Sequence, residues 1–234
     1  MDKQRVQSQQ IERSRARAVE FYGRYGETLE QIRALLAIRL SQLALAYTSK
    51  HRLPPEAVEV STRVKSLPSF LAKLERKGWP EFTQPTSVIQ DLIGARLVCW
   101  FVDDCSGVLA FVSRSHQLRF EAEIEDYIDQ PKASGYRAIH LLAHVGYDKV
   151  HGEPPHTEIC AAEMLCEIQI RSKMQDAWGD ITHEFHYKAK DQGVDSMAYE
   201  QVLAQIAARL AQEDRTLMQL RDAYQRLLPS PSKP

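Results

Sequence analysis

The segment that most constrains the fold is residues 162–172, AEMLCEIQIRS, in which polar and apolar side chains alternate. Successive side chains of a β-strand point to opposite faces of a sheet, so this period predicts a strand. Glu167, Gln169 and Arg171 then share one face, and the apolar residues between them share the core face. Taken alone, the polar row is typical of a solvated strand face. Apolar strands on either side and further polar residues nearby favour a site instead.

The other periodicities predict a sheet flanked by helices. We predict strands at 95–102, 118–128 and 136–147, and helices at 3–47, 66–77, 103–117, 173–189 and 196–228. Gly23 and Gly26 predict a break in the first helix, and residues 148–160 predict a polar loop. Ser66 and Gly78 suit the N-cap and the stop of the second helix. Because helices and strands are mixed along the chain, the fold class is α+β or α/β.

Composition excludes several classes of protein. The formal net charge is −1, so any basic patch must be local. The N-terminus lacks the apolar segment of a secretory signal and no run approaches a membrane span, so we expect a cytoplasmic protein with no membrane partner. The four cysteines, Cys99, Cys105, Cys160 and Cys166, lack zinc-knuckle spacing, and Cys99 and Cys166 are expected to be reduced core residues.

Two charged residues belong to the apolar segment around 95–102. Asp91 lies at the edge of this strand, where α/β proteins place ligands, and its hard oxygens suit magnesium. A helix cap or a turn residue is the alternative, and this residue alone favours the alternative. Arg96 lies inside the strand and needs a partner, because an unpaired buried charge is destabilising.

Two further polar segments suit a ligand that carries phosphates. The segment between residues 63 and 77 holds Arg63, Lys65, Lys73, Arg76 and Lys77, a cluster typical of a polyphosphate site or of a solvated helix face. In the turn at 132–137, Gly135 allows close backbone approach and Tyr136 is able to stack on a base, although a tight turn with an aromatic anchor also fits. Neither common glycine-rich phosphate loop occurs, so side chains would have to cradle the phosphates.

Five sequence blocks are informative because of their order and spacing. They are R-V-K-S-x-x-S-F-L-x-K-L-x-R-K-G at 63–78, D-L-I-G-A-R-L-V at 91–98, K-A-S-G-Y-R-A-I-H-L at 132–141, E-I-Q-I-R-S at 167–172 and W-x-x-x-x-H-x-x-x-Y-K at 178–188. Together they resemble the synthetase domain of the RelA/SpoT alarmone enzymes, and specifically the small single-domain synthetases. The resemblance covers about residues 60 to 190.

The resemblance implies a fold and a reaction. The fold is α+β, with a mixed central β-sheet flanked by helices, like that of nucleotidyltransferases. It implies an N-terminal helical region at 1–58, a synthetase domain at 59–190 and a C-terminal amphipathic helix with its tail at 191–234. The reaction transfers the β,γ-pyrophosphate of ATP to the 3′-hydroxyl of GDP or GTP and releases AMP, with Mg²⁺ as the cofactor.

The resemblance also assigns roles to particular residues. Asp91 would bind magnesium, and Glu167 would deprotonate the acceptor hydroxyl or help to hold the metal. ATP and its phosphates would be bound by Arg63, Lys65, Ser69, Lys73, Arg76 and Arg96. The acceptor nucleotide would be bound by Lys132, Tyr136, His140, Gln169 and Asp176. The main structural expectation is that Asp91 and Glu167 converge.

Two alternatives remain open at this stage. One is a toxic relative that pyrophosphorylates the 3′ end of tRNA or makes adenosine alarmones, against which the near-neutral charge weighs mildly. The other is a non-catalytic nucleotide-binding module, which the presence of both carboxylates disfavours. No His-Asp dipeptide occurs, so a family-type hydrolase site is not expected.

The last predicted helix carries an apolar stripe at three- and four-residue spacing. Its members are Leu203, Ile206, Leu210, Leu217, Leu220, Tyr224 and Leu227. Such a stripe either packs on the N-terminal helices or forms an oligomer seam, and packing is the simpler interpretation. The family resemblance makes a homo-oligomer, a dimer or tetramer through the terminal helices, plausible.

Overall fold

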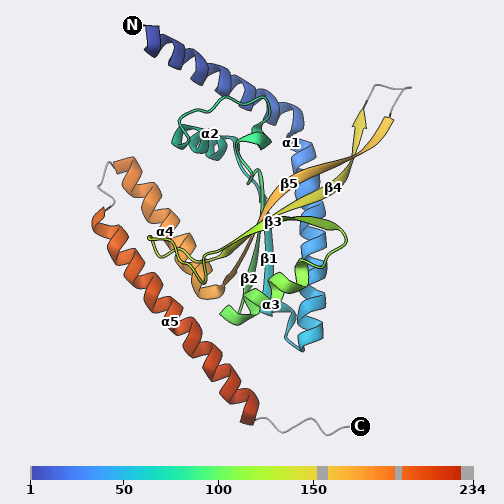
Figure 1. Cartoon of the computed structure of the whole chain (residues 1–234), viewed down its shortest axis with the longest axis vertical. Coiled ribbons are helices and arrows are strands. Elements are labelled where there is room, and N and C mark those ends of the chain that lie inside the picture. The colour runs from blue at the N-terminus through green and yellow to red at the C-terminus, as the bar shows by residue number, and fades with distance from the viewer. Residues whose placement is uncertain (1, 152–157, 193–196, 228–234) are drawn as a thin grey trace.

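A five-stranded sheet with strand order β1-β2-β5-β4-β3 forms the centre of the protein (Figure 1). The computed structural model describes residues 2–151, 158–192 and 197–227. The strands are β1 (Val58–Val64), β2 (Ile93–Cys99), β3 (Leu118–Asp126), β4 (Ile139–His151) and β5 (Glu158–Ser172). Strands β2 and β5 are parallel and the other neighbouring pairs are antiparallel, so the sheet is mixed. The α+β fold class is therefore confirmed.

Helices lie on both sides of this sheet. They are α1 (Asp2–His51), α2 (Leu67–Arg76), α3 (Val102–Val112), α4 (Lys173–Gln192) and α5 (Met197–Leu227). Helices α1 and α3 pack on one face, and α4 and α5 lie on the opposite side (Figure 1). The core between α1 and the sheet contains Leu36, Leu40, Leu97, Ile168 and Ile170, each fully or almost fully buried. This packing leaves the other face of the central strands available for polar side chains.

The second helix has the predicted ends. Ser66 has extended backbone dihedrals and its hydroxyl accepts a 3.4 Å hydrogen bond from the Ser69 backbone N–H, as an N-cap does. Gly78 follows the helix with a φ of +74°, a conformation that glycine adopts without steric penalty. Local rules therefore place α2, whose Phe70 and Leu74 anchor it in the core.

Two sequence-based expectations were wrong, and one strand was not predicted. Gly23 and Gly26 do not break the first helix, which is continuous and changes direction along its length (Figure 1). Residues 58–64, VEVSTRV, form β1, a strand that was not predicted from the sequence although β-branched residues favour one. Much of the predicted loop at 148–160 belongs to β4 and β5, which pair as far as His151 and Glu158; residues 152–157 lie outside the described part.

The expectation for the buried cysteines agrees with the structure, since Cys99 and Cys166 are buried free thiols. The stripe on α5 was expected to pack on the N-terminal helices, but its first half packs on α4, where Leu203 is buried against Trp178. Further along, Leu220 is 64% exposed and Leu227 83% exposed. Among the described helices, none has the length and apolarity that crossing a bilayer requires.

Candidate active site

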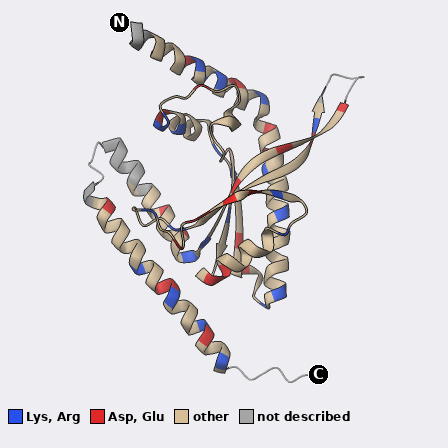
Figure 2. Cartoon of the chain, viewed as in Figure 1, with Lys and Arg blue, Asp and Glu red and all other residues tan. Residues whose placement is uncertain are grey.

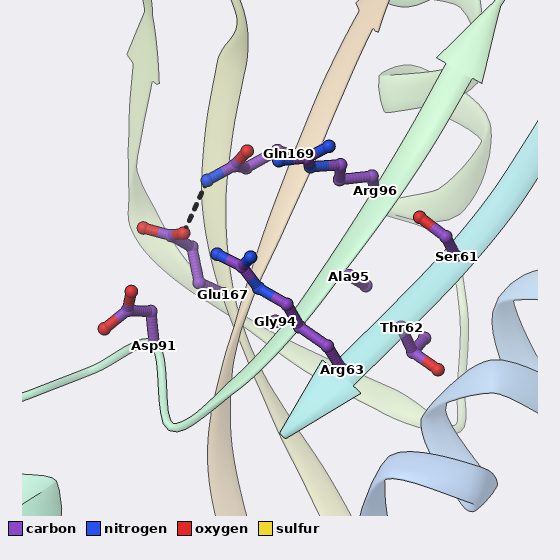
Figure 3. Close-up of a pocket in the computed structure, with 9 residues that line it drawn as sticks. All are labelled: Ser61, Thr62, Arg63, Asp91, Gly94, Ala95, Arg96, Glu167 and Gln169. Atoms are coloured by element: carbon purple, nitrogen blue, oxygen red, sulfur yellow. Dashed lines mark hydrogen bonds between the residues drawn. The ribbon is translucent and has the colours of Figure 1, made fainter. Parts of the chain in front are cut away.

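A cavity of about 260 Å³ lies on the polar face of β1, β2 and β5. It is lined by Ser61, Thr62, Arg63, Asp91, Gly94, Ala95, Arg96, Glu167 and Gln169. Figure 3 shows the carboxylates of Asp91 and Glu167 on the same side of this cavity, with the guanidinium of Arg63 extending toward Glu167. The convergence expected from the sequence is therefore present, although the two residues lie far apart in the chain.

Strand register builds the floor of the cavity. Gly94 of β2 is opposite Glu167 of β5, and Arg96 is opposite Gln169. Arg63 of β1 is opposite Gly94 on its other side. Since paired residues point to the same face, these side chains stand together while Ile168 and Ile170 point into the core. Gly94 has no side chain, which leaves the space above it open.

Two lysines hold the carboxylate of Asp91. Lys65 Nζ is 2.9 Å from Oδ2, and Lys73 Nζ is 2.8 Å from Oδ1. Burial would raise the pKa of Asp91, but the hydrogen bonds from Lys73 and Lys65 and their charges outweigh it and lower the pKa below its usual value. Asp91 is therefore ionised at neutral pH. Two cations lie with it at the edge of the cavity: Lys65, between β1 and α2, and Lys73, on α2.

Glu167 is held from both of its oxygens. Gln169 Nε2 donates a 2.7 Å hydrogen bond to Oε2, and His140 Nδ1 of β4 lies 3.5 Å from Oε1. Burial would raise the pKa of Glu167, yet the contact with His140 and the hydrogen bond from Gln169 lower it below its usual value. The hydroxyl of Tyr136 lies 2.7 Å from His140 Nε2, so one chain of polar contacts runs from Tyr136 to Glu167.

Glu167 also lines a second cavity, of about 180 Å³, on its other side. That cavity is lined by Gln90, Glu123, Glu125, His140, Leu141, Leu142 and Glu167. The first cavity contains two arginines, whereas the second contains three glutamates and one histidine. The carboxylate of Glu167 thus lies at the boundary between two spaces of different charge.

Arg96 pairs with acidic side chains, whereas Lys132 contacts aromatic rings. Arg96 Nη1 lies 2.9 Å from Asp180 Oδ1 and 3.5 Å from Asp176 Oδ1, two acids of α4. This answers the expectation that an arginine in an apolar strand needs a partner. Lys132 Nζ lies 4.0 Å from the ring centroid of Tyr127 and 5.5 Å from that of Tyr136, so it sits over two aromatic rings.

Four of the six predicted ATP-binding residues do not line the cavity: Lys65 and Lys73 contact Asp91 at its edge, and the other two lie on the surface of α2. Ser69 is exposed in the first turn of α2, where it completes the cap with Ser66. Arg76 is exposed at the end of the same helix. The cluster of cations at 63–77 is therefore divided: Arg63, Lys65 and Lys73 reach the site, and Arg76 faces solvent.

Sequence reasoning missed several residues of the site. Ser61 and Thr62 line the cavity because they lie on β1, the strand that was not predicted. Asp180 binds Arg96 from α4, and Tyr127 packs under Lys132. The alternation of VEVSTRV was a signal for the first pair; no local pattern marks Asp180, because its contact depends on where α4 docks.

The donor set fits a magnesium ion that arrives with a nucleotide. Among the described residues, no group of three or more His, Cys, Asp and Glu side chains is arranged to hold a metal. The cavity instead offers the hard oxygens of Asp91 and Glu167. Mg²⁺ is commonly bound by one or two carboxylates together with substrate phosphates and water, so a pair of carboxylates is sufficient.

Comparison with known proteins identifies the family. The model described as "Region found in RelA / SpoT proteins" matches residues 62–192, which include every residue of the site described above except Ser61. The chain belongs to the RelA/SpoT family. The match begins within β1 and ends at the last residue of α4, so it contains the rest of the sheet, β2 to β5, completely.

Curated RelA/SpoT relatives are similar over part of their length. GTP pyrophosphokinase YwaC of Bacillus subtilis is 33% identical over 54% of this chain and 57% of the relative. GTP pyrophosphokinase YjbM of the same organism is 34% identical over 55% of this chain and 56% of the relative. The aligned part of this chain thus spans somewhat more than half the length of these relatives.

Solved structures agree over a greater length. Small alarmone synthetase 1 from Bacillus subtilis, bound to its product pppGpp, superposes with a TM-score of 0.73 at 25% identity, over 88% of this chain and 99% of that one. A GTP pyrophosphokinase family protein from Streptococcus pneumoniae gives 0.70 at 28% identity, over 90% and 97%. The shared fold therefore includes the terminal helices.

Proposed function

We propose that this chain is an ATP:nucleotide 3′-pyrophosphotransferase that moves the β,γ-pyrophosphate of ATP to the 3′-hydroxyl of GDP or GTP and releases AMP. The observation that carries the proposal is the meeting of Asp91 and Glu167 in one cavity with Arg63 and Arg96. Relatives described as GTP pyrophosphokinases, and a structural neighbour described with bound pppGpp, support the choice of guanine nucleotides.

The cavity with the arginines is the proposed ATP site. A triphosphate concentrates negative charge, and Arg63 and Arg96 offer planar sets of donors for its oxygens. Lys65 and Lys73 lie at the edge of this cavity, where both contact Asp91. The grouping of basic residues is local to this cavity, because Figure 2 shows acidic and basic residues interspersed over the chain as a whole. Phosphoryl transfer depends mainly on positioning and charge stabilisation, so this set of side chains suits the task.

Glu167 is the proposed base. It lies between the two cavities, and its lowered pKa keeps it ionised and able to accept a proton at neutral pH. In the proposed step the acceptor 3′-oxygen bonds to the β-phosphorus, the bond from the β-phosphorus to the α-phosphate oxygen breaks, and the hydroxyl proton moves to Glu167. His140 and Gln169 hold the carboxylate in place for this transfer.

We propose Mg²⁺ as the cofactor, with Asp91 and Glu167 as its protein ligands. When bound, the ion would neutralise charge on the phosphate oxygens as the reaction proceeds. Both oxygens of Asp91 contact ammonium groups, so the ion would have to share or displace these contacts. Lys132, Tyr136, His140, Gln169 and Asp176 are the proposed acceptor side of the site.

The test is transfer from ATP labelled at the γ-phosphate to a panel of acceptors. Purified protein with Mg²⁺ is incubated separately with GDP, GTP, GMP, an adenine nucleotide and deacylated tRNA. We expect AMP and a labelled guanosine tetra- or pentaphosphate from GDP or GTP. Transfer to no guanine nucleotide would refute the proposal, and transfer to tRNA or adenine nucleotides alone would assign the chain to the toxic class instead.

Matched variants connect the product to the site. Glu167→Gln keeps the size of the side chain but removes the proposed base, and we expect the rate to fall by about 10² to 10⁴. Glu158→Gln makes the same chemical change on the same strand, at an exposed position far along β5 from the cavity. It should react as the wild type does. Equal rates for the two variants would remove Glu167 from the mechanism.

A further inference from the structure

Arg171 is a buried cation that lines neither cavity. It belongs to β5, and only 2% of its surface is exposed. Burial lowers the pKa of its guanidinium, and its Nε has no hydrogen-bond partner in the described structure. Burying an incompletely paired arginine is unfavourable, and an apolar residue of similar size is often as stable or more stable at such a place. The arginine therefore needs an explanation other than stability.

The contacts of Arg171 all lead to one part of the site. Its Nη2 donates a hydrogen bond to Gln169 Oε1, and its Nη1 lies 3.7 Å from Asp176 Oδ1. Its guanidinium carbon lies 5.8 Å from the ring centroid of Tyr136. Gln169, Asp176 and Tyr136 are three of the five residues assigned to the acceptor nucleotide. Asp176 also lies 3.5 Å from Arg96, one of the predicted ATP-binding residues.

The hydrogen bond to Gln169 fixes which end of the amide meets Glu167. A guanidinium only donates, so the carbonyl oxygen of Gln169 must turn toward Arg171. The amide nitrogen then turns toward Glu167 and donates to Oε2 at 2.7 Å. A flipped amide would direct its carbonyl oxygen at the carboxylate, which is repulsive. Arg171 thus controls the orientation of Glu167 through one intermediate side chain.

Gly179 of α4 provides the space for this guanidinium. A Cβ built on Gly179 would lie 2.7 Å from Arg171 Nη1, closer than such contacts allow. The backbone of Gly179 has no positive φ that would itself require glycine. A side chain at this position of the helix would therefore require the guanidinium of Arg171 to move.

We propose that Arg171 is a positioning residue for the acceptor nucleotide, holding Gln169, Asp176 and Tyr136 from behind while Gly179 leaves room for it. The inference rests on the proposed function, since it concerns the acceptor side of that same site. It differs from a general structural role in one respect: it predicts a defect in acceptor use without a defect in ATP binding or in stability.

The experiment uses two variants that act on the guanidinium in different ways. Arg171→Met replaces it with an apolar chain, and Gly179→Ala displaces it while favouring the helix. For both we expect kcat/KM for GDP to fall about ten- to a hundredfold, the KM for ATP to stay within about twofold, and Tm to equal or exceed that of the wild type. Gly23→Ala, a glycine-to-alanine change in a helix with nothing within 4 Å of the new Cβ, is the matched control; it should leave both kinetic constants unchanged and equal or raise Tm.

Wild-type acceptor kinetics in both variants would overturn the inference. So would a parallel loss of ATP binding, acceptor use and Tm, because that pattern indicates a structural role. If the wild-type protein itself transferred no pyrophosphate to a guanine nucleotide, that result would refute the proposed function and would not count against the inference about Arg171.

A second measurement decides the inference independently of turnover. Proton exchange with water at the ¹⁵N-labelled side-chain amide of Gln169, assigned with Gln169→Glu, should be slow in the wild type and in Gly23→Ala and faster in Gly179→Ala. Equal exchange in all three proteins would show that Arg171 does not hold the amide.

Discussion

The carboxylate of Asp91 holds two ammonium groups close together that would otherwise repel each other. Lys65 and Lys73 approach one carboxylate, and Lys65 is only 9% exposed. Removal of that carboxylate leaves two ammonium groups close together with reduced solvation. Asp91 therefore contributes to the stability of the protein as well as to the proposed metal site, and the two roles are separable by experiment.

Asp91→Asn should destabilise the fold. The variant loses both ion pairs while Lys65 stays buried, so we expect the free energy of unfolding to fall by about 2 kcal/mol, measured by urea denaturation without nucleotide. Asp180→Asn is the control, because Asp180 is 61% exposed at its side chain and its pair with Arg96 should contribute less than about 1 kcal/mol. Equal unfolding of Asp91→Asn and wild type would contradict the description of Asp91 given above.

Tyr136→Phe separates the ring from the hydroxyl. The hydroxyl holds His140, which in turn contacts Glu167, whereas the ring is the part predicted to stack on guanine. We expect kcat to fall about tenfold, equivalent to one lost hydrogen bond, with the KM for GDP nearly unchanged. Tyr136→Ala should raise that KM as well. A higher KM in the Phe variant alone would argue that the hydroxyl itself binds the acceptor.

At the scale of elements, α5 is tied to the turn that carries the acceptor residues. Gly135 has a φ of +86°, and a Cβ there would lie 2.5 Å from Ala207 Cβ and 3.1 Å from Ala204 Cα. Trp178 Nε1 of α4 donates to the Leu203 carbonyl of α5 at 3.1 Å. The turn, α4 and α5 therefore pack as one unit beside the site.

Gly135→Ala should loosen this unit. Both the backbone conformation and the contact with α5 oppose a side chain, so we expect a lower Tm and faster proteolysis within α5. Adding Ala207→Gly removes the steric part and should restore part of the Tm, since the penalty for positive φ remains. A single variant with the Tm of the wild type would show that the turn and α5 are not in contact.

Asp214 of α5 gives the protein a pH-dependent stability. It is 2% exposed and accepts a 2.6 Å hydrogen bond from the Ser172 hydroxyl, and burial raises its pKa above its usual value. The folded state therefore binds the proton more tightly than the unfolded state, so this contribution is full below the unfolded-state pKa and is lost as pH rises through the folded-state pKa. We expect Asp214→Asn to have the higher Tm at neutral pH, with the difference shrinking on acidification; a constant difference would contradict this.

Local rules predicted some of these elements and long-range packing decided the rest. The cap at Ser66, the stop at Gly78 and the alternation around Glu167 are each contained in a few residues, so the sequence was sufficient. The alternation of VEVSTRV is likewise a local signal for β1. The role of Gly179 depends on Arg171 reaching it from another element, and no local pattern contains that information. Likewise, no local pattern predicts that Lys65 and Lys73 both contact Asp91.

At the scale of the whole molecule, the far half of α5 bears apolar side chains in solvent. Leu220, Tyr224 and Leu227 are 64%, 62% and 83% exposed. Exposed apolar residues grouped on one helix are typical of protein–protein contact, and the homo-oligomer considered from the sequence would place its seam here. Arg221 meanwhile binds Asp103 of α3 at 2.5 Å and holds this half against the body.

Leu220→Gln combined with Tyr224→Gln should therefore reduce self-association. The molar mass from light scattering after gel filtration is expected to correspond to a dimer or tetramer for the wild type and to a smaller species for the variant. Val19→Gln, an equally apolar exposed position on α1 at 54% exposure, tests whether the effect is particular to α5. A monomeric wild type would exclude the seam.

The parallel pairing of β2 with β5 has a consequence for how the protein comes into being. Gly94 and Glu167 are neighbours in the sheet, yet β3 and β4 must be synthesised between them. Translation at about 5–20 residues per second separates the emergence of the two strands by several seconds. A nascent chain that has released β1, α2 and β2 carries the arginines and lysines of the site before it possesses Glu167. The cavity becomes complete only after β5 has been synthesised.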